Sequence, residues 1–410
     1  DIKQRRKKMK ILISLACSIG SMGIAWGSLL SLNISDRISL QRGVFLSSLG
    51  FVYFVSLTDF FNRFLLETAK GLEWRKKYHL MVSDVMDITN KLVSAVQASL
   101  SCLAGFLVCK SSCNRSFLHA SHFASEAYAW FGAAYFFYDL WSMYKVHIHK
   151  VLDKLKMVKD QAGNGLKNGN NGHQVFDGRR NGNGNGVCRA DGGVECREKE
   201  IHDDYGNEIS LEARPSFWHY ISRQPLMVGH HIFIGSFGLC VIAYLRGGLG
   251  DCIFSFIFLM EASTPFVSLR SILSTMGMKS TNLYMINGIF MLVTFFIFRI
   301  LMLPFVFYWY SLTVNLPFIR AVASLPRGCK ISICILFLPQ IYWFYLILRG
   351  AIKVFFPQKM IPPKRNRGEF PKKPTNCVIS TDNEAKNQDG KFEENFRILD
   401  NDKQKSLTLM

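Results

Sequence analysis

Apolar residues gather in about eight blocks of about 20 residues each, and polar residues fill the stretches between them. The blocks lie at about residues 11–33, 43–65, 89–109, 124–144, 225–245, 251–270, 283–310 and 331–349. A helix of about 20 residues is about 30 Å long, which matches the hydrocarbon thickness of a bilayer. The pattern therefore predicts an all-α integral membrane protein with about eight transmembrane helices.

Two long polar stretches divide the chain further. The first, at 150–215, is rich in glycine and asparagine, and the second forms the tail at 357–410. Neither offers many apolar side chains to bury, so we expect both to be disordered. The predicted organisation is an N-terminal segment at 1–42 with one extra hydrophobic span, a main membrane domain at 43–356 that the insertion interrupts, and the tail. The first block is typical of a signal anchor or a signal peptide, and its length favours an uncleaved span.

The chain carries 49 lysine and arginine residues against 30 aspartate and glutamate residues, a formal net charge of +19. In a soluble protein this excess would suggest nucleic-acid binding. Here basic residues gather beside the apolar blocks, at 5–8, 70–77, 145–159 and 359–367. If every block crosses the membrane, all four clusters lie on one side, which the positive-inside rule identifies as the cytosol. Both termini are therefore predicted to be cytosolic, and no nucleic-acid partner is expected. Two arginines, Arg320 and Arg327, fall on the opposite side.

Eleven cysteines are scattered along the chain without a pair in C-x-x-C spacing. That spacing is a usual mark of a zinc site, and no regular disulfide framework is visible either. Cys109 and Cys113 are close enough in sequence to pair on the lumenal side, but two separate buried thiols are the favoured interpretation. No bound metal ion is predicted.

Ionisable side chains inside three of the blocks are the main functional signal. His230 and His231 are neighbours in the fifth block, Asp139 lies in the fourth and Glu261 in the sixth. Such groups are costly in hydrocarbon, and membrane proteins usually keep them for function. At about 1.5 Å per residue, His230 and Asp139 lie roughly 8 Å below the cytosolic face, and Glu261 lies roughly 15 Å from the lumenal face. The four residues are candidates for one polar cluster.

Four further polar residues in the blocks are predicted to line the same cavity, namely Gln97, Tyr138, Asn287 and Gln340. Gln97 and Asn287 come out roughly 12 Å and 6 Å below the cytosolic face, and Gln340 near the midplane. Arg299 is assigned to the lumenal end of its span and is interpreted as a snorkelling or structural charge. The sequence thus predicts a polar cavity in the cytosolic half of a helical bundle.

The histidine pair fits a specific chemistry. Neighbouring helical residues point about 100° apart, so one imidazole can face the cavity while the other meets a neighbouring helix or a backbone carbonyl. A carboxylate within reach fixes the imidazole tautomer and raises its basicity, which suits a general base or a nucleophile for acyl transfer. Two other interpretations stay open: a hydrogen bond between helices without catalysis, and a metal site formed by His230, His231 and a carboxylate.

Several strings carry a resemblance to a known family. They include YAWFGAAYFFYDLWSMY from Tyr128, VGHHIFI from Val228 and EASTPFVSLR from Glu261. The chain resembles TLC-domain proteins, the group that includes the ceramide synthases, and it is most similar to the third TLC-domain-containing subfamily. The resemblance covers about residues 44–356 without the insertion. It implies six helices that form a barrel around a polar cavity.

The resemblance also implies a function. Ceramide synthases transfer an acyl group from acyl-CoA to the amine of a sphingoid base, and the family pattern points to His230, His231, Asp139 and Glu261 as catalytic residues. It implies no bound cofactor, with acyl-CoA as a co-substrate, and lipid partners in the bilayer. It is also compatible with assembly with itself or with other TLC-domain proteins. The implied location is the endoplasmic reticulum membrane, with the Golgi and the plasma membrane as alternatives.

This chain departs from the synthase pattern at three places. Glu261 stands where the synthases have an aspartate, and Gln97 stands where relatives have a histidine. Thr264 and Pro265 occupy the region of a second aspartate. These departures favour the second hypothesis, a non-catalytic lipid-binding protein that regulates membrane lipid composition.

Overall fold

The computed structural model describes residues 2–168 and 216–355. Within these ranges all regular secondary structure is helical. Seven of the described helical segments are long and apolar enough to cross a membrane. They are Gln4–Gly27, Leu40–Glu67, Val82–Ser112, Pro225–Leu245, Asp251–Thr275, Asn282–Thr313 and Arg327–Ile352. The all-α integral membrane fold that the apolar blocks predict is therefore confirmed.

The fourth expected block differs from the other seven. It lies in α5 (Phe123–Asn168), which is helical but less apolar than the other segments, since it carries Glu126, Asp139 and several tyrosines. α5 also continues past 150, where the polar insertion is expected to begin. Residues 150–168 are thus helical, and the rest of the insertion lies outside the described residues, as does the tail.

The extension of α5 is held against the beginning of α4 (Val82–Ser112). Lys150 Nζ lies 3.2 Å from Asp87 Oδ2 of α4. Asp153 Oδ2 accepts a hydrogen bond of 2.9 Å from the backbone N–H of Ser83. These contacts explain why a segment without apolar periodicity remains helical: its polar side chains bind the first turn of a neighbouring helix, where free backbone N–H groups need acceptors.

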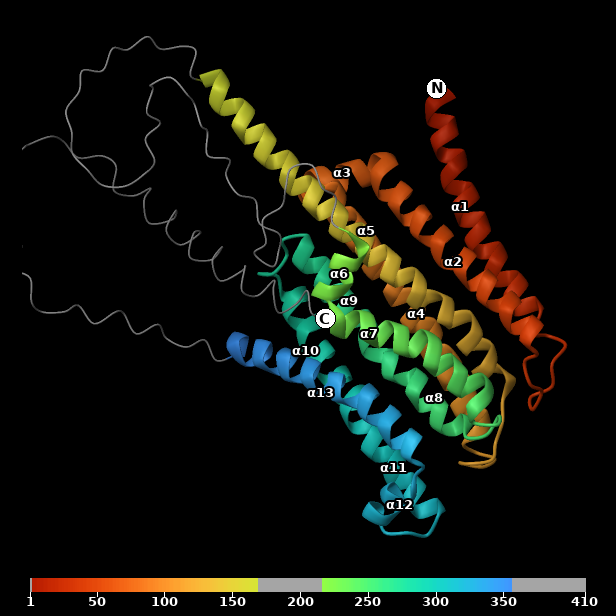
Figure 1. The fold of residues 1–410 in the computed structure, drawn as a ribbon. Coiled ribbons are helices and arrows are strands. Elements are labelled where there is room, and N and C mark those ends of the chain that lie inside the picture. The colour runs from red at the N-terminus through yellow and green to blue at the C-terminus, as the bar shows by residue number, and fades with distance from the viewer. Residues whose placement is uncertain (1, 169–215, 356–410) are drawn as a thin grey trace, which may run out of the picture.

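The first half of the chain forms one side of the bundle (Figure 1). α1 (Ile2–Gly27) packs along α2 (Leu40–Glu67), and α2 packs in turn on α5. The short α3 (Ala69–Lys77) connects α2 to α4. α4 is central, because it contacts α2 and α5 on one side and α8 (Asp251–Leu259) and α9 (Thr264–Thr275) on the other.

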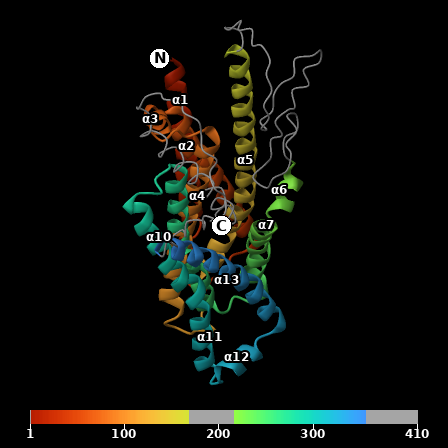
Figure 2. The same ribbon diagram turned by 90° about the vertical axis from the view of Figure 1, so that its left-hand side faces the viewer.

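The second half completes the bundle (Figures 1 and 2). α6 (Phe217–Arg223) and α7 (Pro225–Ile232) pack on α5. α10 (Asn282–Phe295) packs on α9, and α13 (Arg327–Phe355) packs on α10. Two further helices, α11 (Met302–Thr313) and the short α12 (Phe318–Ser324), lead from α10 to α13.

The two ends of the bundle differ in charge. The N-terminus of α1, α3 and the last part of α5 lie at one end, and α12 lies at the other (Figures 1 and 2). The basic clusters at 5–8, 70–77 and 145–159 therefore share one end, as the alternation of spans predicts. The fourth cluster, at 359–367, lies outside the described residues.

Three of the membrane-crossing segments are not continuous α-helices. α7 is followed by two π-helical stretches, η1 (Phe233–Gly238) and η2 (Val241–Leu245). A 3-10 turn, η3 (Met260–Ser263), joins α8 to α9, and a π-helical stretch, η4 (Phe296–Leu301), joins α10 to α11. π-helical turns are rare and often lie at functional sites. The block pattern does not predict them, because these stretches are about as apolar as the helices beside them.

A disulfide bond joins two helices at the end opposite to the basic clusters. Cys113, which follows α4, is bonded to Cys252 at the start of α8, and their Cα atoms are 4.9 Å apart. Cys109 keeps a free thiol, whose Sγ lies 3.6 Å from that of Cys113. The expectation of two unpaired thiols is therefore wrong for Cys113. Its partner lies 139 residues away in the sequence, so local spacing does not reveal it.

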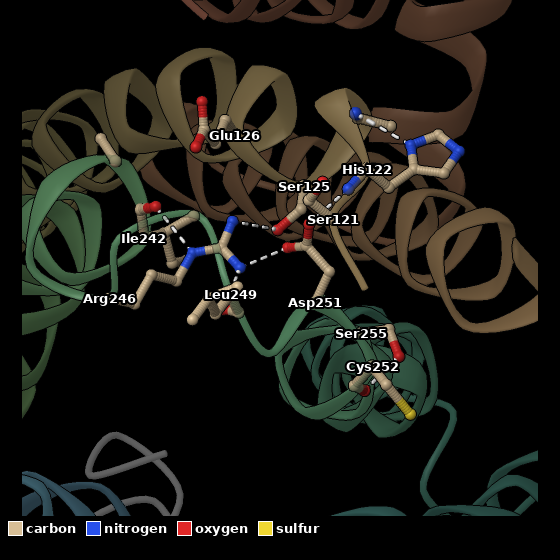
Figure 3. A network of polar contacts seen from close by, with 12 residues as sticks. Ser121, His122, Ser125, Glu126, Ile242, Arg246, Leu249, Asp251, Cys252 and Ser255 are labelled. Carbon is tan, nitrogen blue, oxygen red and sulfur yellow. Dashed lines mark hydrogen bonds and ion pairs between the residues drawn. The ribbon is translucent and has the colours of Figure 1, made fainter. Parts of the chain in front are cut away.

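A buried ion pair lies beside this disulfide bond (Figure 3). Arg246 Nη1 lies 2.5 Å from Asp251 Oδ1, and Asp251 Oδ2 accepts a hydrogen bond of 2.5 Å from the backbone N–H of His122. Arg246 also donates to two backbone carbonyls of its own segment and to the hydroxyl of Ser125. The network ties the loop before α5 to the turn before α8.

Candidate functional site

A polar cavity of about 120 Å³ lies within the bundle, and its wall includes residues of α4, α5, α7, α9, α10 and α13. The residues predicted to be catalytic all line it, namely Asp139, His230, His231 and Glu261. The fold thus brings together side chains of α5, α7 and η3 that are far apart in the sequence. Their catalytic roles stay predictions.

His231 is fully engaged by its neighbours. Its Nε2 lies 2.9 Å from Asp139 Oδ2 on α5. Its Nδ1 lies 2.9 Å from the backbone carbonyl oxygen of Met227, one turn earlier on α7. Both side chains are buried, with 9% of His231 and 4% of Asp139 exposed. With both ring nitrogens occupied, His231 has no nitrogen left for a substrate or a metal ion.

The hydrogen bonds of this pair determine how many protons it holds. A carbonyl oxygen only accepts, so Nδ1 of His231 is protonated and donates a hydrogen bond to the Met227 carbonyl. The contact between Nε2 and Asp139 then needs one more proton, either on the imidazole or on the carboxyl group. In both forms the pair is neutral overall. The Asp139–His231 pair therefore holds one proton shared between α5 and α7.

His230 has the opposite environment. Its ring stands edge-on to Trp343 of α13 with centroids 5.1 Å apart, and 6.0 Å from the ring of His231. It lines the cavity, and no residue in the described part of the chain forms a hydrogen bond with its ring nitrogens. The two histidines divide as expected for helical neighbours, one toward the cavity and one toward a carboxylate and a carbonyl. His230 is the imidazole that remains available to take a proton or to attack an acyl group.

Glu261 is held by Arg299 of η4. Arg299 Nη2 lies 3.1 Å from Glu261 Oε2 and donates to the hydroxyl of Thr264 at 2.7 Å. That hydroxyl in turn donates to Glu261 Oε2 at 2.6 Å. The remaining guanidinium donors reach Ser263 Oγ and Gln340 Oε1, both at 2.9 Å. One arginine thus connects the η3 turn, the start of α9 and α13.

Of the two interpretations of Arg299, a snorkelling or a structural charge, the structure fits the structural one, and it places the residue away from the lumenal end. Its membrane-crossing segment is Asn282–Thr313, so Arg299 lies near the middle, and only 9% of it is exposed. A guanidinium group at this depth cannot reach water by extending along the helix. It is accommodated because Glu261 neutralises its charge and neutral oxygens accept its other protons.

Of the four residues predicted to line the cavity, one is in its wall and a second contacts a wall residue. Gln97 lines the cavity, and its Nε2 donates to the Tyr128 hydroxyl at 3.0 Å. Gln340 is not in the wall, but its Oε1 accepts from Arg299, which is.

Tyr138 and Asn287 also lie outside the cavity wall, and their side chains bond elsewhere. The Tyr138 hydroxyl bonds to Thr58 of α2 and to Ser142, on the face of α5 that packs on α2. Asn287 donates to the backbone carbonyl of Phe266 at 2.9 Å. Depth along a helix does not determine the direction of a side chain around it, so a polar residue at the right height can still face a different neighbour.

Most residues of the wall were not predicted, and two of them matter for the argument below. Lys91 of α4 and Trp343 of α13 both line the cavity. Lys91 lies at the polar margin of an apolar block, and Trp343 belongs to an aromatic stretch that is typical of membrane interfaces. A lysine and a tryptophan are common at such positions, so the sequence does not distinguish them. Only the packing of α4 and α13 places them in the cavity wall.

A metal site finds little support in this geometry. Among the residues that the structure describes, no group of three or more His, Cys, Asp and Glu side chains is arranged to hold a metal ion. Both nitrogens of His231 are occupied, and Glu261 is bound to Arg299. A metal held by His230, His231 and a carboxylate would therefore require two existing interactions to break.

Comparison with known proteins adds an independent finding. A family model described as the TLC domain matches residues 87–349. TLC domain-containing protein 4 of Xenopus tropicalis is 30% identical over 166 residues, which cover 40% of this chain and 61% of the relative. TLC domain-containing protein 4 of Homo sapiens is 34% identical over 133 residues, which cover 31% of this chain and 51% of the relative. No solved structure matches.

These matches are partial but include the site. The aligned regions span about half to three fifths of the length of the relatives. The region that the family model matches, 87–349, contains Asp139, both histidines and Glu261. The relatives carry the number 4, whereas the resemblance in the sequence pointed to the third subfamily, and their names state no substrate or reaction.

Proposed function

The chain belongs to the TLC-domain family, and from that premise we propose that it is an acyltransferase embedded in the membrane. TLC-domain proteins are associated with membrane lipid metabolism or sensing. In the proposed reaction an acyl group passes from acyl-CoA to the amine of a sphingoid base, as the resemblance to the ceramide synthases implies. The observation that carries the proposal is the unpartnered imidazole of His230 at a buried polar cavity.

The proposed reaction needs one proton acceptor. The amine nitrogen attacks the thioester carbonyl carbon, the bond from this carbon to sulfur breaks, and the CoA thiolate leaves. His230 accepts the proton that the amine loses and passes it to the thiolate, so the products are an amide and free CoA thiol. General-base help of this kind contributes about 10²–10⁴ in rate.

The other predicted catalytic residues act as positioning residues in this proposal. The Asp139–His231 pair fixes α7 against α5 and thereby orients the turn that carries His230. The Glu261–Arg299 pair orders the η3 turn and η4 on the other side of the cavity. Because both pairs are neutral, they keep charge low around the reacting groups.

A second function has its own support. Small-molecule sites usually enclose about 300–1,000 Å³, whereas this cavity is about 120 Å³. A lipid-binding protein that regulates membrane lipid composition needs to admit only a head group. Measurable lipid binding without acyl transfer in the purified wild-type chain would favour this second function.

Substitution of His230 tests the proposed enzyme. The full chain is purified in detergent and given palmitoyl-CoA and sphinganine, and amide formation is followed by mass spectrometry. We expect His230→Ala to lower the rate at least about 100-fold. The matched control is His119→Ala, which removes an exposed imidazole from the loop before α5. Activity of His230→Ala close to that of the control would contradict the proposal.

We also infer that the chain lies in the endoplasmic reticulum membrane and that the basic end of the bundle faces the cytosol. The support is the shared end of three basic clusters and the disulfide bond at the other end, since disulfide bonds form in oxidising compartments such as the lumen. An epitope tag before residue 1 should react with antibody when only the plasma membrane is permeabilised. A tag that reacts only after all membranes are permeabilised would show that the basic end faces the lumen instead.

A further inference from the structure

The charges around the cavity leave one group without a partner. Asp139 pairs with His231, and Glu261 pairs with Arg299. Lys91 of α4 lines the same cavity, and no residue that the structure describes forms an ion pair or a hydrogen bond with its ammonium group. The two pairs are neutral, so the wall as a whole has one uncompensated positive charge.

The nearest acidic residue on the same helix face does not supply the missing charge. Asp87 lies one turn before Lys91, but its carboxylate is paired with Lys150 of α5. Lys91 is half-buried and lies about 14 Å along α4 from its first residue, at 1.5 Å per residue. A partly buried ammonium group inside a membrane protein is costly unless an anion accompanies it.

Neutral donors accompany Lys91 in the wall. Asn90 directly precedes Lys91 on α4, Ser94 follows about one turn later, and Ser268 comes from α9. Asn90 and Ser268 are almost completely buried, with 3% and 2% exposed. An ammonium group with amide and hydroxyl donors has the composition of an anion site. A phosphate has enough acceptor oxygens to use several of these donors at once.

We propose that Lys91 binds a phosphate-class anion of the ligand that enters this cavity. The inference deepens the proposed function and rests on it, because it names a charged part of the substrate. Acyl-CoA carries such anions in its diphosphate and nucleotide, and an anionic phospholipid carries one in its head group. In either case Lys91 holds the charged part of the ligand, and His230 remains available for the reacting part.

Binding measurements on Lys91 variants test this site. The full chain in an uncharged maltoside detergent is titrated at low salt with palmitoyl-CoA, with dioleoyl phosphatidic acid, and with the phosphate-free thioester S-palmitoyl-N-acetylcysteamine. We expect Lys91→Gln to weaken binding of at least one phosphate probe about tenfold or more. Binding of the phosphate-free thioester should change less than about twofold. Lys91→Arg, which keeps the charge, should retain most of the affinity.

Two controls separate the site from general electrostatics and from folding. Lys70→Gln removes one positive charge from the exposed face of α3 at the same end of the bundle and should leave all three affinities unchanged. The thermal midpoint of Lys91→Gln should be at or above that of the wild type, because the substitution removes an uncompensated charge. A variant that binds the phosphate-free probe normally is folded at the cavity.

The outcomes are distinct. Loss of palmitoyl-CoA binding alone assigns the anion to CoA, and loss of phosphatidic acid binding alone assigns it to a lipid head group; both support the site. The proposal would be overturned if Lys91→Gln and Lys70→Gln weakened phosphate-probe binding equally. It would also be overturned if Lys91→Gln weakened binding of the phosphate-free probe as much as binding of the phosphate probes. Because binding is measured without turnover, the absence of acyl transfer would contradict the proposed enzyme but not the proposed anion site.

Discussion

The disulfide-bearing end of the bundle and the cavity both contain buried ion pairs, but they differ in what remains unpaired. At the end, the guanidinium of Arg246 meets Asp251, two backbone carbonyls and Ser125, and a disulfide bond lies beside it (Figure 3). At the cavity, His230 and Lys91 lack hydrogen-bonding partners among the described residues.

This difference indicates different tasks. A buried ion pair is weak evidence for stability by itself, because desolvation offsets most of its attraction. A fully paired cluster restricts the loops that it joins, and it has nothing left to offer a ligand. A cluster with an unpartnered imidazole and an unpartnered ammonium group keeps donors and acceptors for a second molecule. On this ground we propose the cavity as the functional site and the disulfide-bearing end as a structural one.

Removal of Asp251 should have the largest effect on stability. Asp251→Ala leaves the buried guanidinium of Arg246 without its carboxylate, and such losses cost about 3–5 kcal/mol. The thermal midpoint of the purified chain should fall by many degrees, while ligand binding by the folded fraction should be unchanged. Glu73→Ala on the exposed face of α3 is the control. A midpoint equal to that of the control would mean that this end does not stabilise the fold.

Loss of the disulfide bond should come next. Cys252→Ser releases a cross-link between segments 139 residues apart, and native disulfides of this kind contribute about 2–4 kcal/mol. The control is Cys240→Ser, which removes an exposed free thiol. Mild reduction should lower the midpoint of the control and leave that of Cys252→Ser as it is. If reduction shifts neither protein, the bond does not contribute.

The block pattern predicted much of the fold and part of the site. Span positions follow from the thickness of the hydrocarbon layer, which local composition reports directly. The match in depth between Asp139 and His230 was visible for the same reason, and in the structure Asp139 bonds to the neighbouring His231.

The remaining features depend on partners that are distant in sequence. The partners of Arg299 were not identified because they come from η3 and α13, and the bond of Cys113 was missed because its partner is on α8. Tyr138 and Asn287 have the right character but face other helices. Packing around a helix axis, rather than position along it, is what the sequence pattern does not contain.

Substitution of Asp139 by asparagine should lower stability less than loss of the disulfide bond does, and it should change the acyl-transfer reaction more. Nδ1 of His231 still donates to the Met227 carbonyl, and the new amide can donate to Nε2, so the contact between α5 and α7 survives without the shared proton. We expect a stability change within about 0.6–1.7 kcal/mol, the range for hydrogen bonds between membrane helices. The pH profile of acyl transfer should change shape. An unchanged profile would show that the shared proton is irrelevant to turnover.

Acid should weaken the disulfide-bearing end slightly, and this is the smallest expected effect. Burial lowers the pKa of His122, with Asp251 opposing this shift. The unfolded chain therefore takes up its proton at a higher pH than the folded chain, so stability falls as the pH drops through about 6.5. Thermal midpoints at pH 7.5 and 5.5 measure this. His122→Gln should reduce the difference between the two midpoints, and an unchanged difference would assign it to other groups.

The most direct test compares the two regions in one experiment, by measuring acyl transfer per folded molecule in His230→Ala and Asp251→Ala beside the wild type. The distinction between an unpartnered and a fully paired cluster predicts that His230→Ala keeps a thermal midpoint near that of the wild type and loses at least about 100-fold in rate. It predicts the reverse for Asp251→Ala, with a large fall in midpoint and a near-normal rate in the folded fraction. Equal rate losses in the two variants, or a His230→Ala protein that retains the wild-type rate, would contradict the assignment of function to the cavity.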